Sequence, residues 1–332
     1  MTVAPQVIAP ARRRRLRAAG LGWFDEHGRR FAFRGPRDPY LVLCSEVVLQ
    51  QTQVTRGEPA WSRFTAHFPT FEVLAAASTA DVLRTWSGLG YNRRALSLQR
   101  TARIVVERWA GRLPQDLAEL ERLPGVGPYT ARAVAAICFG RPVAAVDTNV
   151  RRVVTRLVAP RTPLGAAQLQ TLADALVPRD RPADWSAALM DIGSIFCRPR
   201  EPACADCPLR AECRTAGHRP LPRPILRGRS AHAVAGQASA GLARRRLRGA
   251  IVERLRGARD GVWVRLDGGG SGGDGVSAVL QALERDGLIE LDRSGRARLA
   301  LGQARDRASG SSAVAATSSR AAAQPRVTMT GP

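Results

Sequence analysis

The chain has 332 residues and a formal net charge of +23, and all 51 basic residues are arginine because the sequence contains no lysine. A positive charge excess of this size indicates a polyanionic partner, and nucleic acid is a better candidate than a membrane surface. No apolar run reaches about 18 residues and no apolar segment follows the arginine-rich start, which argues against a membrane-spanning helix and a secretory signal peptide.

An apolar helix is predicted over residues 40–54, after a basic arm and a first helix within residues 1–37. Its first ten residues are apolar except for Ser45 and Glu46. A glutamate in such a helix is costly unless it is paired or protonated. Glu46 is therefore either the partner of a buried arginine, with Arg34 as the candidate, or a carboxylic acid whose pKa is raised by desolvation so that it can donate a proton.

Two polar features follow this helix. Gln50, Gln51 and Thr52 are flexible or small groups that could enter a duplex and fill the gap left by an extruded base. Residues 57–110 read as short helices interrupted by a glycine loop with Tyr91 at its tip. Taken alone, this loop is a connection between helices with Tyr91 packed on the body.

Residues 117–157 predict a helix, a glycine hairpin and a second helix. Pro128 stands where the second helix can begin, since its missing N–H is not needed there. Gly125 and Gly127 let backbone N–H groups approach an anion such as a DNA phosphate, although an ordinary helical hairpin has the same pattern. Asp147 then precedes a further helix, either as its N-cap or as a carboxylate held close to a deoxyribose.

These motifs carry a family resemblance. The run LPGVG-x-x-T-A followed by VDTNV-x-R-V resembles the signature of the helix-hairpin-helix DNA glycosylase superfamily. The helix SEVxLQQTQV is similar to that of the adenine DNA glycosylase (MutY) family, whose members remove adenine mispaired with 8-oxoguanine. The resemblance covers residues 30–215 and hardly extends into the remainder.

The resemblance implies roles for particular residues. Glu46 would protonate adenine at N7, Asp147 would stabilise the cation that develops at C1′, and Tyr129 would lie beside them. Asn149 would orient Asp147 or the sugar. Four of the residues expected to contact DNA have a particular role in the family. Gln51 would act as a wedge with Thr52 close to the orphaned base, while Leu89 would lie near the 8-oxoguanine and Tyr91 would stack beside it. The full set expected to contact DNA is Arg34, Gln50, Gln51, Thr52, Leu89, Tyr91, Gly125, Gly127 and Asn149.

Four cysteines, Cys197, Cys204, Cys207 and Cys213, are spaced C-x6-C-x2-C-x5-C. Without a secretion signal, such a loop indicates a metal site rather than disulfides. Zinc would accept four thiolates, but a single close pair favours a [4Fe–4S] cluster. The resemblance implies the [4Fe–4S] cluster of the MutY and endonuclease III branches. The other two cysteines, Cys44 and Cys138, lie in apolar segments predicted as helices, and we interpret them as buried core residues.

The predicted fold class is all-α, a two-lobed helix-hairpin-helix glycosylase fold with a [4Fe–4S] loop and a small winged-helix-like tail. One lobe, a six-helix barrel, spans residues 38–138, and the cluster lobe joins residues 1–37 to 139–217. The tail comprises a linker at 218–245, the winged-helix-like module at 246–302 and a disordered end at 303–332. It does not match the larger domain with which full-length family members read 8-oxoguanine.

The resemblance implies a monomeric, cytoplasmic, nucleoid-associated bacterial enzyme that binds double-stranded DNA and excises adenine paired with 8-oxoguanine or guanine. Since the chain has no lysine to form a Schiff base, we expect a monofunctional glycosylase. The alternatives are a thymine or uracil mismatch glycosylase, an endonuclease III-like lyase, which would carry a lysine in place of Tyr129, and a non-catalytic DNA-binding protein, which needs neither Glu46 nor Asp147.

Overall fold

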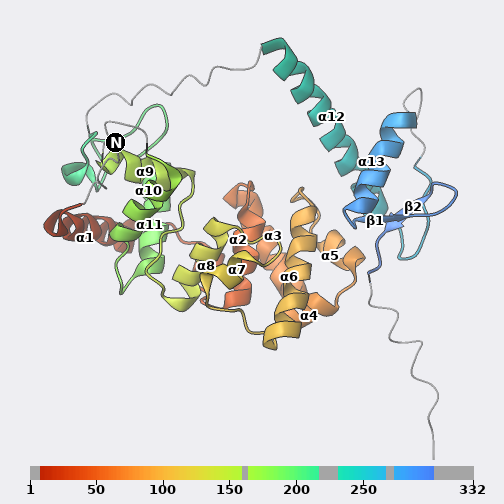
Figure 1. Cartoon of the computed structure of the whole chain (residues 1–332), viewed down its shortest axis with the longest axis horizontal. Helices are drawn as coiled ribbons and strands as arrows, with labels where there is room; N and C mark the ends of the chain where they lie inside the picture. The colour runs from red at the N-terminus through yellow and green to blue at the C-terminus, as the bar shows by residue number, and fades with distance from the viewer. Residues whose placement is uncertain (1–7, 159–163, 217–230, 267–272, 303–332) are drawn as a thin grey trace, which may run out of the picture.

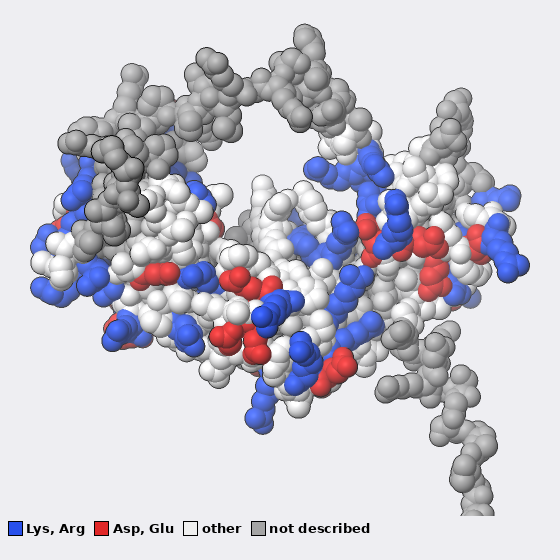
Figure 2. Space-filling view, viewed as in Figure 1, with Lys and Arg blue, Asp and Glu red and all other residues white. Residues whose placement is uncertain are grey.

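The computed structural model describes residues 8–158, 164–216, 231–266 and 273–302, and the predicted disordered end at 303–332 lies outside them. The described chain is mostly helical, as predicted, with one two-stranded sheet near its C-terminal end (Figure 1). None of the described helices is long and apolar enough to cross a membrane. On the face shown in Figure 2, arginines and acidic side chains are interspersed rather than segregated into one patch.

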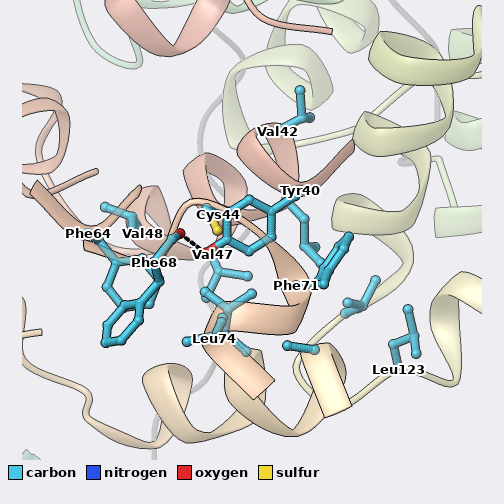
Figure 3. Packing of buried hydrophobic residues seen from close by; sticks show 14 of the residues in the cluster. Tyr40, Val42, Cys44, Val47, Val48, Phe64, Phe68, Phe71, Leu74 and Leu123 are labelled. Carbon is cyan, nitrogen blue, oxygen red and sulfur yellow. Dashed lines mark hydrogen bonds between the residues drawn. The ribbon is translucent and has the colours of Figure 1, made fainter. Parts of the chain in front are cut away.

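The first hydrophobic core is built around α2, a nearly wholly apolar helix. Tyr40 packs its ring edge-on against Phe71 and donates a hydrogen bond to the Phe68 carbonyl, so its one polar atom is satisfied inside the core (Figure 3). The helices surrounding this core are α2 (Pro39–Leu49), α3 (Val54–His67), α4 (Phe71–Ala76), α5 (Thr79–Thr85), α6 (Arg93–Trp109), α7 (Leu117–Glu121) and α8 (Pro128–Phe139).

A second core joins the N-terminal helix to later parts of the chain. The helices concerned are α1 (Pro10–His27), α9 (Thr148–Val158), α10 (Ala166–Leu176) and α11 (Pro182–Ile195). Gly20 of α1 lies against the ring of buried Trp185, where an added Cβ would come within 2.8 Å of the indole. The Arg12 guanidinium also reaches the carbonyls of Leu157 and Glu212. These contacts fix α1 on a part of the chain more than a hundred residues away.

The C-terminal residues form a third core. It consists of α12 (Ala231–Arg256), α13 (Gly273–Arg285) and the antiparallel strands β1 (Ile289–Leu291) and β2 (Ala297–Leu299), with Ile289 opposite Leu299. Apolar residues of α5 and α6 contribute to the same core, so the predicted tail is docked on the first group of helices. Figure 1 shows this module beside α5 and α6.

Two predicted boundaries are wrong. The helix expected over residues 40–54 ends at Leu49, because Gln51 adopts a left-handed backbone conformation with φ of 53°. The segment predicted as a linker over 218–245 is helical from Ala231 onward, where α12 begins. Its alanine-rich composition favours helix, and the interspersed glycines and serines concealed that preference.

Candidate functional site

A cavity of about 680 Å³ brings together residues from three regions of the chain. Glu46 reaches it from α2, Tyr129 from the first turn of α8, and Asp147 and Asn149 from the start of α9. Pro128 begins α8 as predicted, which sets Tyr129 one residue into the helix. Residues up to 103 positions apart thus share one site, and the cavity contains the three expected catalytic residues.

The Glu46 carboxyl has an unusual proton affinity. Its pKa is raised to about 7, chiefly by burial and also by the nearby Asp147 carboxylate, while the Tyr129 hydroxyl and Arg34 act in the opposite direction. Burial and these two carboxylates also raise the pKa of Tyr129 well above its usual range. A carboxyl with a pKa near neutrality is suited to general acid catalysis, because it is still partly protonated at physiological pH.

The Asp147 carboxylate accepts two hydrogen bonds at the start of α9. Its Oδ1 accepts from the Val150 backbone N–H at 2.7 Å, which is the N-cap geometry predicted from the sequence. Its Oδ2 accepts from Asn149 Nδ2 at 2.9 Å, and Asn149 Oδ1 accepts in turn from Arg152 at 2.8 Å. Arg152 also donates to the Cys197 carbonyl, so this chain of contacts connects the carboxylate with the cysteine loop.

Arg34 is not the ion-pair partner of Glu46, which corrects the first interpretation of the apolar helix. Its guanidinium binds Asp191 in a bidentate manner, at 2.8 Å and 2.9 Å, and Arg29 binds the same carboxylate at 2.5 Å. Asp191 is fully buried on α11. Burial alone would raise its pKa, but the hydrogen bonds from Arg34 and Arg29 outweigh this effect and lower it.

A groove of about 970 Å³ is lined by both predicted DNA-entering loops. Gln50, Gln51 and Thr52 contribute from the turn after α2, and Leu89 and Tyr91 from the glycine loop. Gln51 and Tyr91 both have positive φ, at 53° and 45°, a strained conformation for these residue types. Tyr91 is half exposed, whereas Leu89 is buried with 5% exposure. Such strain is concentrated at functional sites in proteins.

Arg94 joins these two loops and was not identified from the sequence. Its guanidinium donates to the carbonyls of Val47, at 2.8 Å, and Gln50, at 2.5 Å, on one side. On the other side it donates to the Leu89 carbonyl at 3.1 Å, and it lies over the Tyr91 ring at 5.5 Å. The position of each loop therefore depends on the other through one side chain.

The glycines of the hairpin serve different purposes. Gly125 has a φ of 81°, and an added Cβ would meet the Ser97 Cβ at 2.8 Å, so both conformation and space require glycine. Gly127 is exposed, precedes Pro128, and has no atom within 4 Å of an added Cβ. The turn thus presents the backbone at the start of α8 to solvent, where an anion could approach it.

The four predicted metal ligands lie in one loop after α11. The pKa of the Cys207 thiol is raised to about 11, chiefly by burial and also by Cys197, Cys213 and Cys204, against a lowering hydrogen bond from the Leu209 backbone, so Cys207 is within electrostatic range of the other three. Arg156 donates to the Cys197 sulfur at 3.3 Å. The four thiols are free, and within the described ranges no group of three or more His, Cys, Asp or Glu is arranged to hold a metal ion.

Comparison with known proteins identifies related sequences. Residues 44–179 match the family described as HhH-GPD superfamily base excision DNA repair protein. An adenine DNA glycosylase of Mycolicibacterium smegmatis is 37% identical over 296 residues, which is 84% of this chain and 94% of the relative. An adenine DNA glycosylase of Mycobacterium tuberculosis is 41% identical over 72% of this chain and 77% of the relative. The human adenine DNA glycosylase is 40% identical over 60% of this chain and 39% of its own.

Solved structures give the same fold. A thermostable thymine-DNA glycosylase superimposes with a TM-score of 0.58 at 30% identity, covering 61% of this chain and 96% of the other. A trapped covalent complex of endonuclease III with DNA superimposes with a TM-score of 0.55 at 24% identity, over 63% of this chain and 98% of the other. The predicted helix-hairpin-helix fold is thereby confirmed.

The ion pairs of Asp191 should contribute strongly to stability. Asp191→Asn keeps the side-chain shape but leaves Arg29 and Arg34 without a buried counter-charge, and breaking such a pair costs about 3–5 kcal/mol. Asp184→Asn is the matched control, since it lies on the same helix, is partly exposed and should cost less than about 1 kcal/mol. Urea unfolding at pH 7 measures both values, and equal losses would contradict the assignment.

Glu46 should make stability depend on pH. Its pKa in the folded protein, about 7, lies above the ordinary value of 4.5, so the folded state retains a proton that the unfolded chain releases. The stabilisation of the folded state by this retained proton is fully present below pH 4.5 and is lost as the pH rises through 7. Relative to wild type, Glu46→Gln should therefore gain up to about 3 kcal/mol between pH 4.5 and pH 8. Denaturant unfolding at both pH values measures this gain, and a pH-independent difference would contradict it.

Proposed function

The chain belongs to the adenine DNA glycosylase (MutY) family of the endonuclease III superfamily, and from this premise we propose that its substrate is adenine mispaired with 8-oxoguanine or guanine in double-stranded DNA. It is a DNA N-glycosylase that excises adenine in base excision repair. The observation that carries the proposal for the site is the cavity in which Glu46, with its pKa near 7, faces Asp147.

The proposed chemistry uses these two groups in different ways. The adenine turns out of the duplex into the cavity, and protonated Glu46 donates its proton to N7. The electron pair of the glycosidic bond leaves with the base, and the positive charge that remains at C1′ is stabilised by the Asp147 carboxylate. Water then adds to C1′ and loses a proton, which leaves an abasic sugar and free adenine.

The neighbouring side chains position these groups. Asn149 donates to Asp147 and so limits its rotation toward the sugar. Tyr129 supports the charged form of Glu46 and would stabilise it after the proton has left. Arg34 adds positive charge at the same carboxyl, while its ion pair with Asp191 fixes its orientation. Each residue thus favours the geometry or the charge that the proposed step requires.

The DNA contacts follow from the two loops and the hairpin. Gly125 and Gly127 would bring backbone N–H groups and the N-terminal end of α8 to a phosphate. Gln51 and Tyr91 stand at the strained tips of the two loops and would enter the duplex, Gln51 as a wedge and Tyr91 by stacking beside the base left unpaired. Arg94 would keep both tips in register during insertion.

We also propose that Cys197, Cys204, Cys207 and Cys213 hold a [4Fe–4S] cluster. The donor set is chemically suitable, because one loop supplies four cysteines, thiolates are the usual ligands of such clusters, and the Cys207 thiol interacts electrostatically with the other three. When bound, the cluster would crosslink the loop and hold it in a fixed conformation. Arg156, which donates to the Cys197 sulfur, would compensate part of the added negative charge.

The proposed acid role of Glu46 is tested by Glu46→Gln, which preserves shape but cannot deliver a proton. Single-turnover excision from a duplex with adenine opposite 8-oxoguanine should fall at least about 100-fold, the lower range for general acid catalysis, while DNA binding is retained. Near-normal excision by the variant would refute this role.

The same assay defines the substrate and the reaction type. Duplexes with a G·T mismatch or thymine glycol should remain uncut, because the site is proposed to select adenine. As the chain contains no lysine, the product strand should stay intact until alkali cleaves it at the abasic site. Borohydride trapping of a covalent complex that survives blocking of the N-terminal amine would refute the monofunctional reaction.

The proposed cluster is tested by metal content. Protein purified without oxygen should be yellow-brown and contain about four iron atoms per chain, as a single cubane requires. Replacing Cys204 by serine should reduce iron content and stability, since the loop loses one attachment, whereas Cys138→Ser, a change outside the loop, should retain iron. Stoichiometric zinc without iron would contradict the proposal.

A further inference from the structure

The groove beside the two DNA-entering loops has a second wall formed by the C-terminal module. Arg244, Arg245 and Arg248 of α12 line it together with Gln51 and Tyr91. Basic side chains gather at this part of α12 in Figure 2. The groove therefore joins the tips proposed to enter the duplex with a basic helix from a part of the chain that has no assigned function.

The docked module holds α12 in a defined place. Leu255 and Val252 are buried in a core shared with α5 and α6. Arg256 donates to the Leu83 carbonyl at 2.8 Å and to the Asn92 side chain at 2.8 Å, next to Tyr91. Asn92 thus links the glycine loop to the module.

The arginines that face the groove differ in their partners. Arg248 pairs with Asp286 at 2.6 Å, which fixes its orientation. Arg244 and Arg245 are exposed, and no acidic residue in the described chain forms a salt bridge with either. Two unneutralised guanidinium groups at the edge of a groove present the charge and the bidentate donors that a phosphodiester backbone requires.

The position of the groove indicates which DNA strand it meets. Thr52 lines both the Glu46 cavity and the groove, which therefore adjoin the same turn after α2. If the adenine is extruded into the cavity, the partner strand remains on the side where the loop tips and α12 face each other. We propose that Arg244 and Arg245 bind phosphates of the strand opposite the adenine; this inference rests on the proposed function.

The proposal is tested with the full-length protein and a duplex carrying a 2′-fluoro-2′-deoxyadenosine, which resists excision. Dissociation constants are measured over a range of salt concentrations. Arg244→Gln with Arg245→Gln should flatten the slope of log K against log salt by about 2, since each lost phosphate contact contributes about 0.9. The matched control, Arg246→Gln with Arg254→Gln, removes the same charge from exposed positions of α12 outside the groove and should leave the slope nearly unchanged. Equal changes in the two variants would overturn the proposal.

The strand is identified by replacing phosphates with neutral methylphosphonates. Near the mismatch on the strand opposite the adenine, this change should weaken wild type and the control but have little effect on the groove variant. On the adenine strand, it should weaken all three proteins to the same extent. The strand assignment would be overturned if methylphosphonates on the adenine strand weakened wild type and the control but had little effect on the groove variant. Excision by the wild-type protein is measured separately, so a failure of the proposed substrate is distinguishable from a failure of the groove.

Discussion

The site depends on keeping one carboxyl group buried and protonatable beside a second carboxyl group. Glu46 lies on α2, a helix of the first core, and Asp147 directly precedes α9, a helix of the second core, so their separation depends on how the two groups of helices are joined. The buried Asp191 carboxylate, bound by Arg34 and Arg29, forms one such connection. Because an ion pair has directional partners, it fixes the distance between the carboxyl groups more closely than apolar contact alone would.

Features with a local chemical cause could be predicted from the sequence. Pro128 begins its helix, and Asp147 caps the next one, because each position needs only its immediate neighbours. Gly125 is required by a positive φ within a four-residue turn, which the hairpin pattern indicates. Glu46 could be singled out because an acidic group in an apolar helix conflicts with its surroundings, and such conflicts are concentrated at functional sites.

Features that depend on contacts between distant segments could not be predicted. The partner of Arg34 is 157 positions away on α11, and the sequence offers no pattern that selects Asp191 from other acidic residues. Arg94 interacts mainly with backbone carbonyls, which every residue has, so no partner motif exists for it. Asn92 carries no motif of its own, and its contact with Arg256, 164 positions away, appears only in the folded chain.

The net charge of +23 overstates the charge available to DNA, because many guanidinium groups stabilise the protein itself. Arg17 binds the carbonyls of Leu176 and Val177, and Arg94 and Arg152 likewise bind several carbonyls each. A guanidinium group can serve in this way because its five N–H donors point in fixed directions, whereas an ammonium group has no planar fork. The exclusive use of arginine is therefore as much a property of internal packing as of DNA binding, and exposed arginines without acidic partners are the better guide to where a phosphate binds.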